Sequence, residues 1–184
     1  MTLPGFDGLT SLPALGRLDL VAAPVAAALS AWPRAAEVAV VEIDPDLADT
    51  AALVAAYDLP LAGSANCVLV AGSRGGEERI AACVVNADTR ADVNTTVRKL
   101  LDVRKCSFLA MDRAVAESGM EYGGITPIGL PTGWRVLVDA AVLAAPVTMI
   151  GSGVRRSKII LSGAALADLP GAEVVEGLGR PTTV

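Results

Sequence analysis

The segment 123–129 restricts the backbone more than any other part of this chain. It reads Gly-Gly-Ile-Thr-Pro-Ile-Gly and lies between two apolar segments. Glycine accepts positive φ and lets another molecule approach its backbone, whereas Pro127 fixes its own φ and biases Thr126 toward an extended conformation. Such a run is typical of a tight turn between strands, and it also suits a pocket wall that presents backbone N–H groups. The segment alone leaves both interpretations open.

Composition limits the size of the fold and its chemistry. The 184 residues fit one domain with a sizeable core, and with 53% hydrophobic but only 3% aromatic residues we expect an aliphatic interior. Histidine is absent, which excludes serine–histidine catalysis and removes the commonest zinc ligand. Cys67, Cys83 and Cys106 match neither a disulfide framework nor a zinc site, so we expect reduced thiols. Because the glycines also lack the Walker and G-x-G-x-x-G orders, the sequence predicts no metal and no nucleotide cofactor.

Charge and hydropathy narrow the range of partners. The net charge of −5 argues against binding nucleic acid through bulk electrostatics, but it is compatible with a local basic patch. No apolar run reaches the ~20 residues of a membrane span, and the N-terminus lacks a basic region ahead of an apolar stretch. We therefore expect a cytoplasmic protein that binds no membrane.

Helical and strand patterns alternate in the first half of the chain, and strand patterns dominate the second half. This order indicates an α+β domain with a mixed, curved sheet over residues 18–184. Residues 1–17 carry an apolar residue at every third position, which predicts an arm that packs on the domain or on a partner. The expected helices cover residues 19–32, 46–57, 92–101 and 112–120, and the expected strands cover residues 38–43, 67–71, 80–85, 136–142, 147–150 and 158–161, with a hairpin turn at 72–76.

Three short motifs occur in order along the chain. The spacing Gly-x-x-x-Pro joins Gly123 to Pro127, Asp139 ends an apolar strand, and Gly-Ser-Gly follows the next strand at 151–153. In these motifs, and over residues 20–169, the chain resembles the YbaK family, also called the ProRS-associated or aminoacyl-tRNA editing domain family. The resemblance implies a partly closed, barrel-like mixed sheet flanked by helices. It also implies a hydrolase that cleaves the ester between a wrong amino acid and tRNA.

The resemblance implies a catalytic centre, and this chain differs from the family at one of its residues. Family members commonly hold a lysine on the strand after the second helix, facing the Gly-x-x-x-Pro loop, and this column falls on Asn66 here. A lysine ammonium stabilises the oxyanion that develops during ester hydrolysis. Asn66 offers two neutral donors instead, and the backbone N–H of Gly124 is a second candidate, so both are assigned a catalytic role. A strand-edge residue that bonds its own backbone explains Asn66 equally well.

Two glycine-containing turns, and the basic residues after the second, are candidates for substrate binding. The resemblance favours a Ser152 that faces a ligand, and a turn between strands explains the same residue. Arg155 and Arg156 suit a phosphate or the tRNA 3′ end, because a guanidinium binds phosphate through two hydrogen bonds. Asp139 needs a partner such as Arg135 or Arg155, since an unpaired buried carboxylate is costly. The substrate-binding candidates are Gly123, Ile125, Thr126, Pro127, Gly129, Gly151, Ser152, Gly153 and Arg155.

The sequence leaves three functions open. The first is a free-standing editing domain that hydrolyses mischarged aminoacyl-tRNA, with the tRNA 3′ end and an aminoacyl-tRNA synthetase as partners. In this case the basic residues Arg98, Lys99, Arg104 and Lys105 either contact the acceptor stem or form a solvated helix end. The second is a catalytically inactive relative that binds an aminoacyl group, a small ligand or a protein partner. The third is a homo-oligomer, such as a homodimer, in which residues 1–17 swap onto a neighbour.

Overall fold

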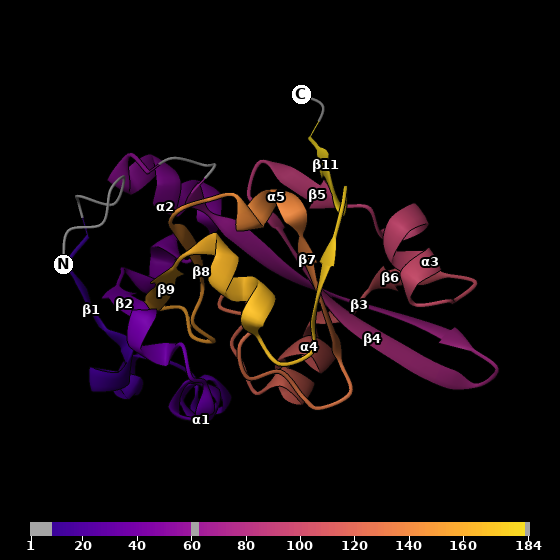
Figure 1. Ribbon diagram of the computed structural model, residues 1–184, viewed down its shortest axis with the longest axis horizontal. Helices are drawn as coiled ribbons and strands as arrows, with labels where there is room; N and C mark the ends of the chain where they lie inside the picture. Colours follow the sequence, from indigo (N-terminus) through magenta and orange to yellow (C-terminus); the bar gives the residue numbers. More distant parts are fainter. Residues whose placement is uncertain (1–8, 60–62, 183–184) are drawn as a thin grey trace.

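The computed structural model describes residues 9–59 and 63–182, whose strands form two main sheets and a small ribbon (Figure 1). The strands are β1 (Ser11–Pro13), β2 (Ala39–Glu42), β3 (Ala65–Arg74), β4 (Glu77–Asn86), β5 (Thr89–Ala91), β6 (Cys106–Phe108), β7 (Arg135–Asp139), β8 (Thr148–Gly151), β9 (Ser157–Leu161), β10 (Ala172–Val175) and β11 (Gly179–Pro181). One sheet has the order β1-β2-β9-β8 and is antiparallel. The other has the order β10-β7-β4-β3-β6 and is mixed, because β7 pairs in parallel with both β10 and β4. The ribbon pairs β11 with β5.

Short helices flank the sheets, and their ends follow the usual capping rules. The helix α2 begins where the Asp49 carboxylate accepts hydrogen bonds from the N–H groups of Ala51 and Ala52, at 3.0 and 3.2 Å. The helix α4 ends at Gly119, whose φ of 68° suits glycine. The α-helices are α1 (Ala23–Ala31), α2 (Thr50–Tyr57), α3 (Arg98–Leu100), α4 (Met111–Ser118) and α5 (Ala140–Leu143).

One of the hydrophobic clusters of the interior joins the two sheets. It contains Leu29 of α1, Val40 and Ile159 of the antiparallel sheet, and Val84 and Val138 of the mixed sheet, all buried. The expected aliphatic interior is confirmed, because the one aromatic residue among the buried hydrophobic side chains of the described segments is Trp32. The expected α+β domain with a mixed sheet flanked by helices is likewise confirmed.

The β3–β4 hairpin is the longest strand pair, and it extends away from the antiparallel sheet toward α3 (Figure 1). Its turn is Gly75–Gly76, with φ values of 61° and 85°, as the tight turns of two-residue hairpins require. The hairpin expected from the sequence is confirmed, but 72–74 belongs to β3 rather than to the turn.

The expected strand over residues 136–142 is wrong in its second half. The strand β7 ends at Asp139, whose carboxylate accepts a hydrogen bond from the Ala141 N–H at 3.0 Å and so caps α5. The same carboxylate accepts from the Gly179 N–H. The expected arginine partner of Asp139 is therefore also wrong, because Arg135 pairs with Glu173.

Element ends and short strands differ from expectation in other places. The helix expected from residue 19 begins at Ala23, because 18–20 forms a 3-10 turn. Asp92 caps its helix as expected, accepting from the Thr95 N–H at 3.2 Å, but the first turn is a π turn. The strands β1, β5, β6, β10 and β11, of three or four residues each, were not expected.

Part of the expected N-terminal arm lies inside the fold. β1 pairs with β2, so residues 11–13 form an edge strand, while residues 1–8 lie outside the described residues. The domain boundary at residue 18 and the homodimer stay predictions. Within the described segments, no helix has both the length and the apolar character needed to cross a membrane.

Candidate functional site

A cavity of about 550 Å³ opens where the two sheets meet, between α2, the beginning of β3, the β8–β9 pair and the loop before Ile125. This volume falls in the range of small-molecule sites, roughly 300–1,000 Å³. The polar side chains that line it come from different elements: Asp49, Thr50, Ser64, Asn66, Arg155 and Lys158. The apolar part of the lining includes Leu53, Cys67, Leu69, Ala114, Ile125, Met149 and Ile150.

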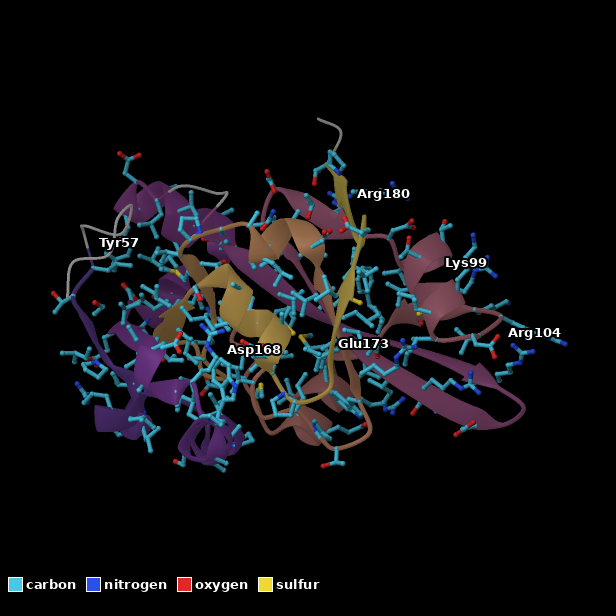
Figure 2. All side chains as sticks on the ribbon, viewed as in Figure 1. Tyr57, Lys99, Arg104, Asp168, Glu173 and Arg180 are labelled. Atoms are coloured by element: carbon cyan, nitrogen blue, oxygen red, sulfur yellow. The ribbon has the colours of Figure 1, made fainter. Side chains whose placement is uncertain are left out.

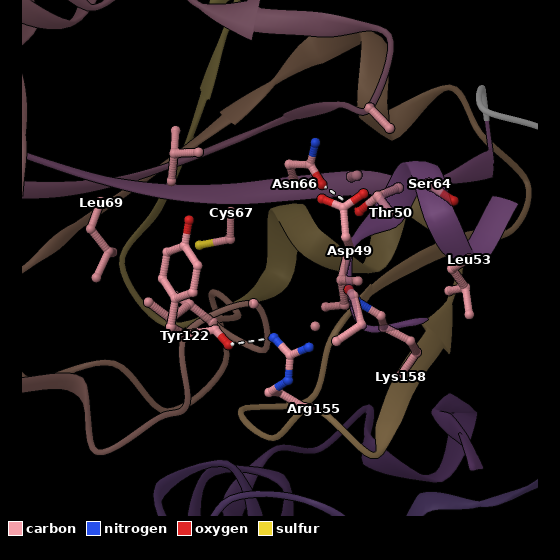
Figure 3. Close-up of a pocket in the computed structure, with 18 of the residues that line it drawn as sticks. Asp49, Thr50, Leu53, Ser64, Asn66, Cys67, Leu69, Tyr122, Arg155 and Lys158 are labelled. Carbon is pink, nitrogen blue, oxygen red and sulfur yellow. Dashed lines mark hydrogen bonds between the residues drawn. The ribbon is translucent and has the colours of Figure 1, made fainter. Parts of the chain in front are cut away.

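Asn66 lies on β3 at one wall of this pocket. The Thr50 hydroxyl donates a hydrogen bond to Asn66 Oδ1 at 2.8 Å, and Thr50 is itself positioned by the Asp49 cap of α2 (Figure 3). No described residue accepts a hydrogen bond from the Asn66 amide nitrogen. The first turn of α2 therefore fixes the amide and leaves its two N–H donors for a ligand or water.

Lys158 lies on β9 and enters the pocket from the side opposite Asn66 (Figure 3). Its side chain is buried, with 5% of its surface exposed, and Nζ donates to the backbone oxygen of Ala48 at 2.7 Å. Burial lowers the pKa of Lys158 to about 8, a shift that Asp49 opposes and Arg155 increases. The pocket thus holds a lysine ammonium that remains mostly charged at neutral pH.

Lys158 was not predicted from the sequence, because the lysine of the family was expected only on the strand that carries Asn66. The signal was present, since Lys158 begins the otherwise apolar run 158–161, which was correctly read as a strand. A charged residue in such a run is costly to bury and therefore points to a site.

Arg155 contributes a second positive charge beside the pocket. Its guanidinium donates to the backbone oxygens of Pro45, at 2.8 Å, and Tyr122, at 3.5 Å (Figure 3). Both acceptors are neutral, and no described carboxylate forms an ion pair with the guanidinium. Arg156 does not line the pocket, and its guanidinium donates to the backbone oxygen of Asp19.

Two loops that the sequence predicted to form the site interlock through their backbones. The Gly153 N–H donates to the Gly124 oxygen at 2.7 Å. A Cβ at Gly124 would lie 2.6 Å from the Val154 oxygen, and a Cβ at Gly151 would overlap the backbone of Gly124, so only glycine fits. The Gly124 N–H donates to the Glu121 oxygen at 2.9 Å and is therefore not free to bind an oxyanion in this structure.

The predicted site residues divide into two groups. Those that line the pocket are Asn66, Gly123, Ile125, Gly151 and Arg155. Those that do not line it are Gly124, Thr126, Pro127, Gly129, Ser152 and Gly153.

Most members of the second group have a packing role. Ser152 is buried and its hydroxyl donates to the Ser157 oxygen at 2.9 Å. Gly129 faces the backbone of Pro24, and Gly153 faces the side chain of Ala22, so a Cβ at either position would collide. Thr126 is fully buried.

Several solved structures share this fold at low sequence identity. A proposed trans-editing enzyme for prolyl-tRNA synthetase is 19% identical, with a TM-score of 0.72, covering 85% of this chain and 95% of that one. A scaffold from epitope grafting by computational design is 22% identical, with a TM-score of 0.70, covering 86% and 96%. A protein described as hypothetical is 18% identical, with a TM-score of 0.68, covering 77% and 90%. These likenesses show the fold.

Sequence comparison identifies the family directly. A search among curated proteins gave no match. The family described as the aminoacyl-tRNA editing domain matches residues 44–169, a segment that includes α2, β3, the Gly-x-x-x-Pro loop and β9 and hence every wall of the pocket. The chain belongs to the aminoacyl-tRNA editing domain family.

Proposed function

We propose that this chain hydrolyses the ester bond of a mischarged aminoacyl-tRNA in the pocket between β3 and β9. The observation that carries the proposal is the buried Lys158 in the same pocket as Asn66. Membership of the editing family supports the reaction class. Lys158 supplies a charged group to a pocket in which Asn66 is neutral.

Ester hydrolysis needs a held carbonyl, a positioned water and stabilisation of the oxyanion. Water attacks the carbonyl carbon, and negative charge develops on the carbonyl oxygen. The bond to the ribose oxygen of the terminal nucleotide then breaks, and a proton from the attacking water passes to that ribose oxygen, which leaves as a hydroxyl. A preorganised ammonium in a partly dry pocket stabilises that charge, and loss of one such donor typically costs about 10²–10³-fold in rate. Lys158 takes this role, and the free N–H donors of Asn66 orient the water or the aminoacyl group.

The apolar part of the pocket accommodates the amino-acid side chain. Cys67, Leu69 and Met149 offer no charged partner, and burial raises the pKa of the Cys67 thiol far above its usual range, so this thiol stays neutral. A methylene changes binding by only about 1–3 kcal/mol, which is too little for a synthetase to reject a slightly smaller amino acid. A second, hydrolytic site for apolar or small amino acids is therefore useful to the cell, and the synthetase that makes the error is the expected partner.

Hydrolysis of a panel of mischarged tRNAs tests the proposal. Alanine, cysteine and serine esters of proline tRNA are the first members, because a structural neighbour is described as acting for prolyl-tRNA synthetase. We expect turnover of at least one member by the wild type and its loss in Lys158→Met. Gly124→Val is a weaker control than the sequence suggested, because its side chain would collide with the backbone of Val154 and displace the loop. Wild-type rates equal to the uncatalysed rate on every member would contradict the proposal.

A second candidate function is a binding module without catalysis. The observation that favours it is the neutral Asn66, whose oxygen is already occupied by Thr50. In that case Asn66→Lys creates hydrolytic activity in a wild type that has none. If hydrolysis instead requires Lys158, the added lysine places a second positive charge in the pocket and lowers the rate.

A further inference from the structure

Exposed aromatic side chains border the mouth of the pocket. Phe108 of β6 and Tyr122 both line it, yet 65% and 62% of their surfaces are exposed. Met111 beside them is 57% exposed. The chain has only two residues each of Phe, Tyr and Trp, so a pair of exposed aromatic side chains at one opening is a concentrated apolar surface.

Three positive charges without partners lie together at the α3 end of the molecule (Figure 2). Every lysine and arginine of the chain lies in the described residues, and most arginines form ion pairs or donate to backbone oxygens. Lys99, Arg104 and Lys105 are exposed and form neither kind of bond to any described residue. Figure 2 shows Lys99 and Arg104 projecting outward at the same end of the molecule, beside α3.

The strand β6 connects the cations to the aromatic residues. It follows directly after Lys105 and ends at Phe108, so three residues of extended chain, about 10 Å, separate the last cation from the pocket mouth. We use the term 3′-end track for the surface formed by Tyr122, Phe108, Lys105, Arg104 and Lys99.

We infer that the 3′-end track binds the single-stranded 3′ end of tRNA and the first phosphates of its acceptor stem. Proteins that hold single-stranded nucleic acid combine aromatic platforms, on which bases stack, with cations that follow the phosphates. The track has both components in that order from the pocket outward: Phe108 and Tyr122 stack the last bases, and Lys105, Arg104 and Lys99 contact successive phosphates. A chain with a net charge of −5 binds RNA only where such a local surface exists. The inference rests on the proposed function, because it assumes that the ester to be cleaved lies in the pocket.

Two substrates separate the track from the pocket. An amino acid esterified to adenosine reaches the pocket but has no phosphates, whereas mischarged tRNA uses both. In the triple variant Lys99→Ala/Arg104→Ala/Lys105→Ala we expect kcat/KM for mischarged tRNA to fall at least tenfold and that for the adenosine ester to stay within twofold. The slope of log kcat/KM for tRNA against log salt concentration should become less steep by about 2, since each of the three single-strand phosphate contacts contributes about 0.7 to the slope. Arg90→Ala is the matched control, because Arg90 is exposed and equally without a partner in the described segments but lies outside the track.

A binding measurement keeps the inference testable if hydrolysis is absent. Fluorescence anisotropy with a deacylated acceptor-stem hairpin ending in CCA reports on the track alone. We expect the triple variant to weaken binding at least tenfold and Arg90→Ala to leave it unchanged. This result, in a wild type that hydrolyses nothing, refutes the proposed function and leaves the track in place. Hydrolysis of tRNA together with equal RNA affinity in the wild type and the triple variant would overturn the inference and leave the proposed function standing.

The aromatic residues are tested by substitutions that keep or remove a ring. We expect Phe108→Leu to raise KM for tRNA about tenfold with little change in kcat, and Phe108→Trp to retain the wild-type KM, because a stacked base needs a ring. Tyr122→Leu and Tyr122→Trp should follow the same pattern. If leucine serves as well as tryptophan at both positions, the rings do not stack on bases. If, in addition, the substitutions change only the mass of the protein in size-exclusion chromatography, the surface is a protein interface and the inference is wrong.

Discussion

The two facing walls of the pocket treat charge in opposite ways. On β3, Asn66 is neutral and its oxygen is held by the Thr50 hydroxyl at 2.8 Å. On β9, Lys158 keeps a buried ammonium whose nearest acceptor is a backbone oxygen at 2.7 Å rather than a carboxylate. Lysines are almost never fully buried without a partner, because desolvation of the charge is expensive. The difference teaches that one wall of this pocket is neutral at its central polar residue while the opposite strand carries the cation.

The largest effect is expected when the charge of the β9 wall is removed. We expect Lys158→Met to lower kcat for the best mischarged tRNA by at least about 100-fold, the usual effect of losing one oxyanion donor. The melting temperature should stay the same or rise, because the substitution removes a buried charge and keeps an apolar stem of similar size. Single-turnover hydrolysis and thermal unfolding measure the two effects. An unchanged rate in a folded variant would assign the charge no catalytic role.

The pH dependence of hydrolysis also tests the role of the Lys158 ammonium. Lys158 has a pKa of about 8, so its ammonium is present below pH 8 and is lost as the pH rises through that value. We expect kcat/KM, after subtraction of uncatalysed hydrolysis, to fall up to about tenfold for each pH unit above 8. This decline above pH 8 should be absent from whatever activity Lys158→Met retains. A rate that stays constant between pH 8 and pH 9.5 would contradict the need for the ammonium.

The lowered pKa also predicts how stability depends on pH. Between about 8 and 10.5 the unfolded chain binds the Lys158 proton while the folded chain does not, so the free energy of unfolding rises with pH in this window. Below pH 8 both states bind the proton and this contribution is constant. Urea unfolding at pH 8 and pH 10 should show the rise in the wild type and a smaller rise in Lys158→Met.

The smallest effect is expected on the β3 wall. Thr50→Val keeps the size of the side chain but removes the hydroxyl that holds Asn66 Oδ1, and a neutral hydrogen bond of this kind contributes about 1 kcal/mol. We expect kcat to fall about fivefold, with KM nearly unchanged, because a freely rotating amide still offers its donors. Thr96→Val, whose hydroxyl donates to Asp92 far from the pocket, is a matched control. A reduction in kcat as large as that of Lys158→Met would show that the position of the Asn66 amide matters for catalysis as much as the Lys158 charge.

Local patterns in the sequence predicted most of the fold. The hairpin around Gly75, the cap at Asp92 and the strand at 158–161 each follow from short-range preferences of backbone and side chain. The end of β7 was missed because an aspartate at this point of the sequence can either continue a strand or cap a helix. In the structure the Asp139 carboxylate caps α5 and also accepts a hydrogen bond from Gly179, a residue distant in the sequence. The strands of three or four residues were missed because they are held by pairing with distant partners and carry no pattern of their own.

The site was predicted in part for a similar reason. The predicted residues Asn66, Gly123 and Gly151 line one pocket: Asn66 lies near the beginning of β3, Gly151 ends β8, and Gly123 lies in the loop after α4. Spacing does not tell which glycines face a cavity and which face another part of the chain, so Gly124 was assigned a catalytic role and Gly153 was assigned to the substrate, although both face neighbouring chain segments. Lys158 lies 92 positions after Asn66, and only the pairing of the sheets shows that the two side chains share a pocket.

The exchange of charge between the two walls is the most direct test of the role of Lys158. Single-turnover hydrolysis should be measured for the wild type, Asn66→Lys, Lys158→Gln and the double variant on the same mischarged tRNA. We expect Asn66→Lys to reduce the rate about tenfold by like-charge repulsion, Lys158→Gln to reduce it about 100-fold, and the double variant to exceed Lys158→Gln because one ammonium is restored. If Asn66→Lys is faster than the wild type and Lys158→Gln is as fast as the wild type, the charge on β9 takes no part in the reaction.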